Sequence, residues 1–78
     1  MIHCLITSSQ KTESYKNLQG ITLPAFSGQM QVLPGHAESF ILLKTGNVIL
    51  KLSSGQKTVI PIKGGECYIK DDKSVIIL

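Results

Sequence analysis

Residues 43–66, LKTGNVILKLSSGQKTVIPIKGGE, carry the same turn signal three times. Each signal is an apolar residue, two spacer residues, a glycine and a polar residue, and the glycines are Gly46, Gly55 and Gly65. They lie nine and ten residues apart. Because glycine reaches the positive φ that tight hairpin turns require, this spacing predicts a meander of short antiparallel strands, as in a sandwich or a barrel.

The segments beside these turns alternate apolar and polar residues, as half-buried strands do. Residues 48–52, 57–62 and 66–70 each place apolar side chains on one face. Pro61 lacks the N–H that a central strand donates, so its strand is predicted at an edge or a bulge of the sheet. Residues 40–43 (FILL) are apolar on both faces, which predicts a strand buried between two layers.

The first half of the chain is less regular. Residues 2–8 alternate and predict a strand, whereas the polar residues 9–17 predict a turn with a short extra strand. Residues 18–23 and 30–33 predict two further short strands. No segment has the apolar spacing of a helix, so the fold class predicted from the pattern is all-β, with essentially no helix.

The composition agrees with a small β-rich domain. Among 78 residues, ten Ile, nine Leu and four Val stand against two Ala. The net charge is +3, but all eight basic residues are Lys, and they are spread singly along the chain. Base readout relies on Arg and single-strand binding on aromatic platforms, so solubilising lysines are favoured over a nucleic-acid groove.

The two cysteines, Cys4 and Cys67, are too few for the disulfide framework of a small secreted domain. They predict buried thiols in a reducing compartment, and the sequence leaves open whether they lie close together. Met1 leads into a short mixed stretch rather than a signal peptide, and no apolar run approaches the ~20 residues that span a bilayer. We therefore expect a soluble, intracellular chain.

No catalytic, cofactor-binding or metal-binding constellation is predicted. The only histidines, His3 and His36, form no metal-ligand pair, and metal sites need three or four convergent ligands. Gly64 and Gly65 lead into a strand rather than a helix, so they form no phosphate-binding loop. A small nucleic-acid-binding β-barrel and a small-ligand-binding sandwich stay open as alternatives, the first supported only by the net charge.

One segment is more specific. Residues 28–37, GQMQVLPGHA, resemble the signature of the epsilon subunit of F-type ATP synthases, which is called delta in mitochondria. Residues 44–46 (KTG), 62–65 (IKGG) and 75–78 (VIIL) match further positions of the same family in the same order. The match covers essentially the whole chain.

The resemblance implies a flattened antiparallel β-sandwich of about ten short strands, the amino-terminal domain of the family. It implies one domain, residues 1–78, without the carboxy-terminal helical hairpin, in a naturally short or a truncated form. The implied role is that of a non-enzymatic rotor subunit that binds the gamma subunit and the c-ring and couples proton flow to ATP synthesis. Because the inhibitory and ATP-sensing elements of the family belong to the helices, we expect neither activity from this chain.

By the same resemblance the complex lies peripherally at the cytoplasmic face of a bacterial plasma membrane, or at the equivalent organelle face, with no direct insertion and no nucleic acid. The implied site residues are Gln29, Met30 and Gln31 toward the c-ring, Ser8 and His36 toward gamma, and Pro34, Gly35, Gly46, Gly55, Gly64 and Gly65 in structural turns.

Several positions depart from the family pattern or have a second interpretation. Gln29 stands where many members have Glu, which replaces a charge-assisted bond by a weaker neutral one. Gln31 replaces Gly, and Glu38 stands where Pro is common. Met30 is as well explained by core packing as by an interface, and His36 by a hydrogen bond to its own turn.

Overall fold

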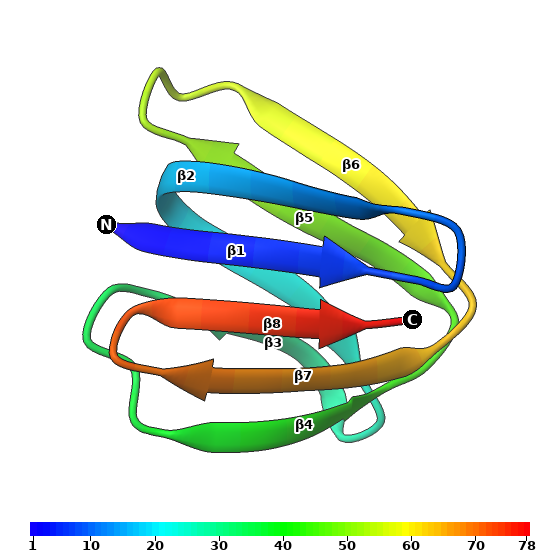
Figure 1. Ribbon diagram of the computed structural model, residues 1–78. Helices are drawn as coiled ribbons and strands as arrows, with labels where there is room; N and C mark the ends of the chain where they lie inside the picture. Colours follow the sequence, from blue (N-terminus) through cyan, green and yellow to red (C-terminus); the bar gives the residue numbers. More distant parts are fainter.

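The computed structural model describes all 78 residues as eight strands without a helix (Figure 1). None of its elements is therefore a helix long and apolar enough to cross a membrane. The strands are β1 (Ile2–Thr7), β2 (Thr12–Ala25), β3 (Gly28–Val32), β4 (Ser39–Leu43), β5 (Gly46–Leu52), β6 (Lys57–Ile62), β7 (Gly65–Lys70) and β8 (Lys73–Ile77).

The all-β prediction is confirmed, but there are eight strands rather than about ten. The difference lies in residues 9–25, where a separate short strand was expected and β2 instead runs unbroken for 14 residues. Asn17 has a φ of 58°, and the register of β2 shifts between Leu18 and Gly20. Such an irregularity bends a strand without ending it, so the two halves of β2 pair with different neighbours.

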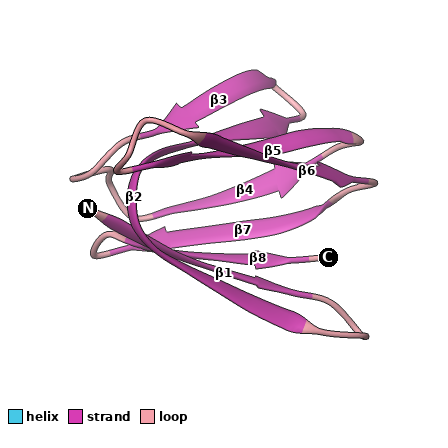
Figure 2. Cartoon of the chain, turned by 90° about the horizontal axis from the view of Figure 1, so that it is seen from above, coloured by secondary structure: helices cyan, strands magenta, loops and turns pink.

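The strands form two layers (Figure 2). One layer contains β4, β7, β8, β1 and the first half of β2, and we call its solvent-facing side the front face. The other contains β3, the second half of β2, β5 and β6, and its solvent-facing side is the rear face. The molecule measures 27 × 25 × 18 Å.

The strand pairing is antiparallel throughout, except that β1 and β8 run parallel, which the meander pattern does not predict. The strand of Pro61, β6, lies at one end of the strand order, as predicted from its missing N–H. The predicted inward faces are also confirmed, because Val48, Leu50 and Ile62 are buried. They belong to a core of 16 apolar side chains between the layers.

The prediction that residues 40–43 are buried on both faces is wrong. Ile41 and Leu43 point into the core, but Phe40 is 51% and Leu42 53% exposed. β4 has the second layer on one face only, and no part of the chain covers its other face. An apolar pattern on both faces therefore does not mark a strand that is covered by a layer on each face here.

The glycine turns are confirmed at Gly55 and corrected at Gly46. Gly55 has a φ of 92°, and its N–H donates to the carbonyl of Leu52 (2.9 Å) in the β5–β6 hairpin. Gly46 lies at the start of β5 and does not have a positive φ. A Cβ there would lie 2.7 Å from the Cβ of Pro24, so close approach of β2, rather than turn geometry, requires glycine.

Gly65 needs glycine both for its positive φ and for the close approach of another strand. We expect Gly65→Ala to lower the free energy of unfolding by about 2–3 kcal/mol. Its φ is 148°, and an added Cβ would collide with the carbonyl oxygen of Ile77. Gly28 is the matched control, because its φ is 124° but nothing lies within 4 Å of an added Cβ. Urea unfolding measures both variants. Equal losses would mean that the φ alone, and not the collision, accounts for the destabilisation.

Candidate partner-binding surfaces

The residues predicted to face a c-ring lie on β3, which pairs with β2 alone. Gln29 and Gln31 are exposed and alternate with Met30, which is half-buried and packs against the core. Thr22 lies beside Gln31 across the strand pair. The structure therefore brings the two amides together on the rear face, while Met30 points to the interior.

Ser8 caps the turn between β1 and β2. Its N–H donates to the carbonyl of Lys11 (2.9 Å), and its hydroxyl oxygen accepts from the N–H groups of Gln10 (3.3 Å) and Lys11 (3.4 Å). The hydroxyl thus has a structural role in this tight turn.

Pro34 and Gly35, which the resemblance places in a structural turn, form a type II turn. The N–H of His36 donates to the carbonyl of Leu33 (3.1 Å), and Gly35 has a φ of 82°. The ring Nδ1 of His36 lies 2.8 Å from the carbonyl oxygen of Ala37, which is the local hydrogen bond that the sequence offered as an alternative. With the proton on Nδ1, the ring donates to that oxygen.

This turn is tied to the turn between β7 and β8. The N–H of Gly35 donates to the Oδ1 of Asp72 (2.7 Å). Asp71 and Asp72 both have positive φ, at 52° and 59°, as a two-residue hairpin turn requires. The carboxylate of Asp72 therefore fixes the position of the loop that carries His36.

Ser8 and His36 lie at opposite ends of the sandwich. The N–H of His3, at the start of β1, donates to the carbonyl of Asp72 (3.0 Å), whereas Ser8 follows the far end of β1. Six residues of strand separate the two ends, about 20 Å at 3.3 Å per residue. A single partner that touches both must extend along the molecule.

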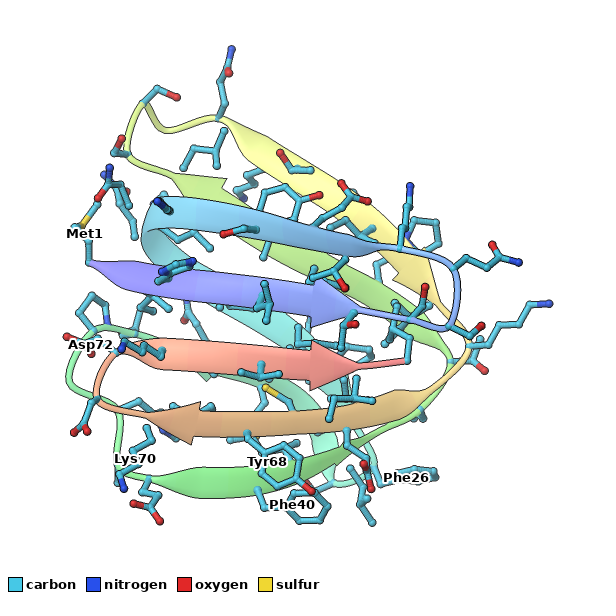
Figure 3. All side chains as sticks on the ribbon, viewed as in Figure 1. Met1, Phe26, Phe40, Tyr68, Lys70 and Asp72 are labelled. Atoms are coloured by element: carbon cyan, nitrogen blue, oxygen red, sulfur yellow. The ribbon has the colours of Figure 1, made fainter.

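An apolar surface occupies the front face between these two ends. The register places Phe40 opposite Tyr68, Tyr68 opposite Val75, and Val75 opposite Leu5, in one row across four strands. Phe40 is 51% and Tyr68 46% exposed, and their ring centroids are 4.7 Å apart (Figure 3). We call this row, together with its exposed neighbours Leu42 and Ile77, the apolar front row.

The apolar front row is not predicted from the sequence, although residues 40–43 contain its signal. This continuous apolar run predicts burial on both faces, but half of it faces solvent. A groove of about 490 Å³ extends the same apolar character around the edge of β4 toward β3. Phe26, which is 69% exposed, and Met30 are among its lining residues. Met30 thus contacts the core and also lines an open groove.

The thiols of Cys4 and Cys67 are both buried, and Ser74 lies in the core with them. The Sγ of Cys67 lies 3.2 Å from the Oγ of Ser74, and β8, which carries Ser74, lies between the strands of the two cysteines. Two strand spacings amount to about 9.6 Å, beyond the Cα separation of about 7 Å that a disulfide tolerates. The cysteines therefore share a core without forming a bond.

Burial also keeps both thiols protonated. Burial, and next the neighbouring Cys67, raise the pKa of Cys4 from 9.0 to about 12. Burial likewise raises the pKa of Cys67, against the opposing effect of its hydrogen bond to Ser74. Since the thiolate is the reactive and metal-binding form, neither cysteine is suited to nucleophilic chemistry. No three His, Cys, Asp or Glu side chains converge on a point where they could hold a metal ion.

The comparisons with known proteins agree on one family. A family model described as "ATP synthase, Delta/Epsilon chain, beta-sandwich domain" matches residues 1–78. The chain is 31% identical over 72 residues to the ATP synthase epsilon chain of Chlorobaculum tepidum. The aligned region covers 92% of this chain and 82% of the Chlorobaculum chain. It is 36% identical over 61 residues to the chloroplastic ATP synthase epsilon chain of Pylaiella littoralis, covering 77% of this chain.

The share of the relatives that is matched varies. The aligned region spans about half of the Pylaiella littoralis chain (45%) and of the Sulfurovum epsilon chain (48%). Among solved structures, a chain of the Euglena gracilis mitochondrial ATP synthase (OSCP/F1/c-ring) superposes with a TM-score of 0.86 at 25% identity, over 97% of this chain and 49% of that one.

A chain of the Tetrahymena thermophila mitochondrial ATP synthase, from a structure of the central stalk and c-ring, has the same fold with a TM-score of 0.82 at 15% identity. The superposition covers 97% of this chain and 61% of the Tetrahymena chain. Sequence, family and fold agree over the full length of the 78 residues, and the protein belongs to the family of ATP synthase delta/epsilon chain β-sandwich domains.

Proposed function

We propose that this chain is a non-catalytic subunit of the central stalk of an F-type ATP synthase, where it binds the gamma subunit and the c-ring and couples proton flow to ATP synthesis. One observation carries the proposal: a chain of this family has an uncovered apolar row on its front face, bracketed by Ser8 at one end and His36 at the other. The complex in which it acts is associated with a membrane from outside the bilayer.

The gamma subunit occupies the apolar front row in this proposal. Aromatic side chains supply the largest contributions to protein interfaces, and the rings of Phe40 and Tyr68 already lie against each other, tilted by 43°, in the free chain. A gamma segment that lies along the 27 Å length of the molecule reaches from the Ser8 turn to the His36 turn. The two predicted gamma positions are then the two ends of one interface.

The c-ring is contacted through Gln29 and Gln31 on the rear face, at a strand that has no second neighbour in the sheet. Met30 points to the interior and lines a groove that it shares with Phe40 and Leu42 of the apolar front row, so the c-ring contact rests on the two glutamines. Gamma and the c-ring therefore engage different surfaces, and both contacts can form at once. A stiff sandwich between them transmits rotation without chemistry on this chain, because closely packed interiors are poorly compressible.

The test is co-elution of the chain with the gamma subunit from the same source in size exclusion at physiological salt. We expect a stoichiometric complex, and we expect ATP hydrolysis by an epsilon-free catalytic complex to be unchanged by these 78 residues, which contain no helix. Separate elution of both proteins, also in the presence of the c-ring, would overturn the proposal.

The c-ring contact has its own readout. Gln29→Ala and Gln31→Ala together should weaken retention on c-ring-containing membranes by about 25-fold, since neutral hydrogen bonds contribute about 1 kcal/mol each. Binding to soluble gamma should stay the same. Gln56→Ala, which removes an exposed amide from the turn between β5 and β6, is the control. A loss of gamma binding in the double variant would place gamma, and not the c-ring, on β3.

A further inference from the structure

The electrical charge is divided unequally between the two layers. Residues 18–32 and 44–63, which form the rear layer and its turns, contain four lysines and no carboxylate. The other four lysines and all five carboxylates belong to the remaining segments. The net charge of +3 is therefore the sum of +4 on the rear layer and −1 on the rest of the chain.

Within the rear layer, Lys51 and Lys57 lie directly opposite each other on β5 and β6, and both are exposed. Like charges in this position destabilise a strand pair. Lys70 and Lys73 have the same cross-strand relation on β7 and β8, but there Glu38 lies 3.9 Å from the amine of Lys70, and two aspartates form the intervening turn. Only the rear pair is left without negative neighbours.

The surface around this pair is partly aliphatic. Val59 is 55% exposed and lies opposite the half-buried Ile49, next to the lysine pair on the same side of the hairpin. Lys44 and Lys63 flank the other end of the hairpin. Exposed aliphatic side chains between lysines are typical of protein surfaces that rest at the headgroup level of a bilayer, where the amines stay beside the phosphates.

We propose that the outer side of the β5–β6 hairpin docks on the headgroups of an anionic phospholipid bilayer. The surface has no Arg and no aromatic side chain, which disfavours a nucleic acid, and it has no aromatic anchor for a protein partner. The inference does not depend on gamma or the c-ring. It concerns the opposite face from the apolar front row, so lipid contact and gamma binding are compatible.

Co-sedimentation of the 78-residue chain with vesicles tests this directly. We expect binding to phosphatidylcholine vesicles that contain phosphatidylglycerol, no binding to phosphatidylcholine alone, and loss of binding when salt rises from about 0.05 to about 0.5 M. Lys51→Gln together with Lys57→Gln should lower the partition constant about 25-fold, at about fivefold for each lysine. Lys70→Gln together with Lys73→Gln is the matched control and should change it less than twofold.

Three results would overturn the proposal. Equal losses in the two double variants would mean that the net charge alone attracts the chain to vesicles. Binding that resists high salt and disappears in Phe40→Ser would place the lipid on the apolar front row. Absence of vesicle binding, with a salt-sensitive shift of single-stranded DNA that needs Lys51 and Lys57, would assign the rear face to nucleic acid.

Discussion

Replacement of both Phe40 and Tyr68 by serine should weaken binding of the gamma subunit by about 100-fold or more, measured by calorimetry on the purified chain. Truncation of a central aromatic side chain in an interface typically costs at least 2 kcal/mol, and these two rings form one tilted pair with centroids 4.7 Å apart. The losses of binding free energy in the two single variants should not add up to the loss in the double variant, because each single substitution also removes the contact between the rings.

The fold should survive this change. Both side chains keep about half of their surface in water in the folded chain, and the ring contact contributes about 0.5–1.5 kcal/mol. Val59→Ser is the matched control, since Val59 is a similarly exposed apolar residue (55%) on the rear layer. An equal loss of gamma binding in the Val59 variant would remove the apolar front row as the docking surface.

The second large effect is an alkaline loss of stability that depends on Cys4. Burial raises the pKa of this thiol from 9.0 to about 12, so the folded state disfavours the thiolate, which the unfolded state forms readily. The stabilisation is complete below pH 9 and is lost as the pH rises from 9 to 12. Each pKa unit between the unfolded and the folded thiol corresponds to about 1.4 kcal/mol, so the free energy of unfolding falls by about 4 kcal/mol across this pH range.

Urea unfolding between pH 7 and pH 11 measures the effect as a difference from Cys4→Ala, because all other side chains are the same in both proteins. The variant should be slightly less stable at pH 7 and lose less stability above pH 9. A thiol reagent should react with neither cysteine of the native chain and with both after unfolding. Identical pH profiles for the two proteins would contradict the role of the buried thiol.

Much of the fold follows from local chemistry. The glycine at position 55 and the Pro34–Gly35 pair fix their turns because few other residues adopt the required φ. Pro61 lies on an end strand because it has no N–H to donate. The family could be identified from residues 28–37 and the ordered motifs after them, since their spacing is set by the same turns.

The long strand β2 and the close approach at Gly46 could not be predicted in this way. A polar stretch such as residues 9–17 is compatible with a turn or with an exposed strand, and only pairing with β1 decides between them. Gly46 satisfies a contact with Pro24, which is 22 positions away and belongs to another strand. The parallel pairing of β1 with β8 likewise joins the two ends of the chain.

The all-β class, the positions of most turns, the inward faces of β5 and β6, and the family follow from the sequence alone, because each depends on residues near one another in the chain. The sequence does not reveal that Phe40 and Leu42 face solvent, that Ser8 and His36 lie at opposite ends of the sandwich, or that two thiols share a core without a bond. The physical reason is common to all three: exposure and proximity depend on which strands become neighbours, and an apolar or reactive side chain is the same in the sequence whether or not another layer covers it.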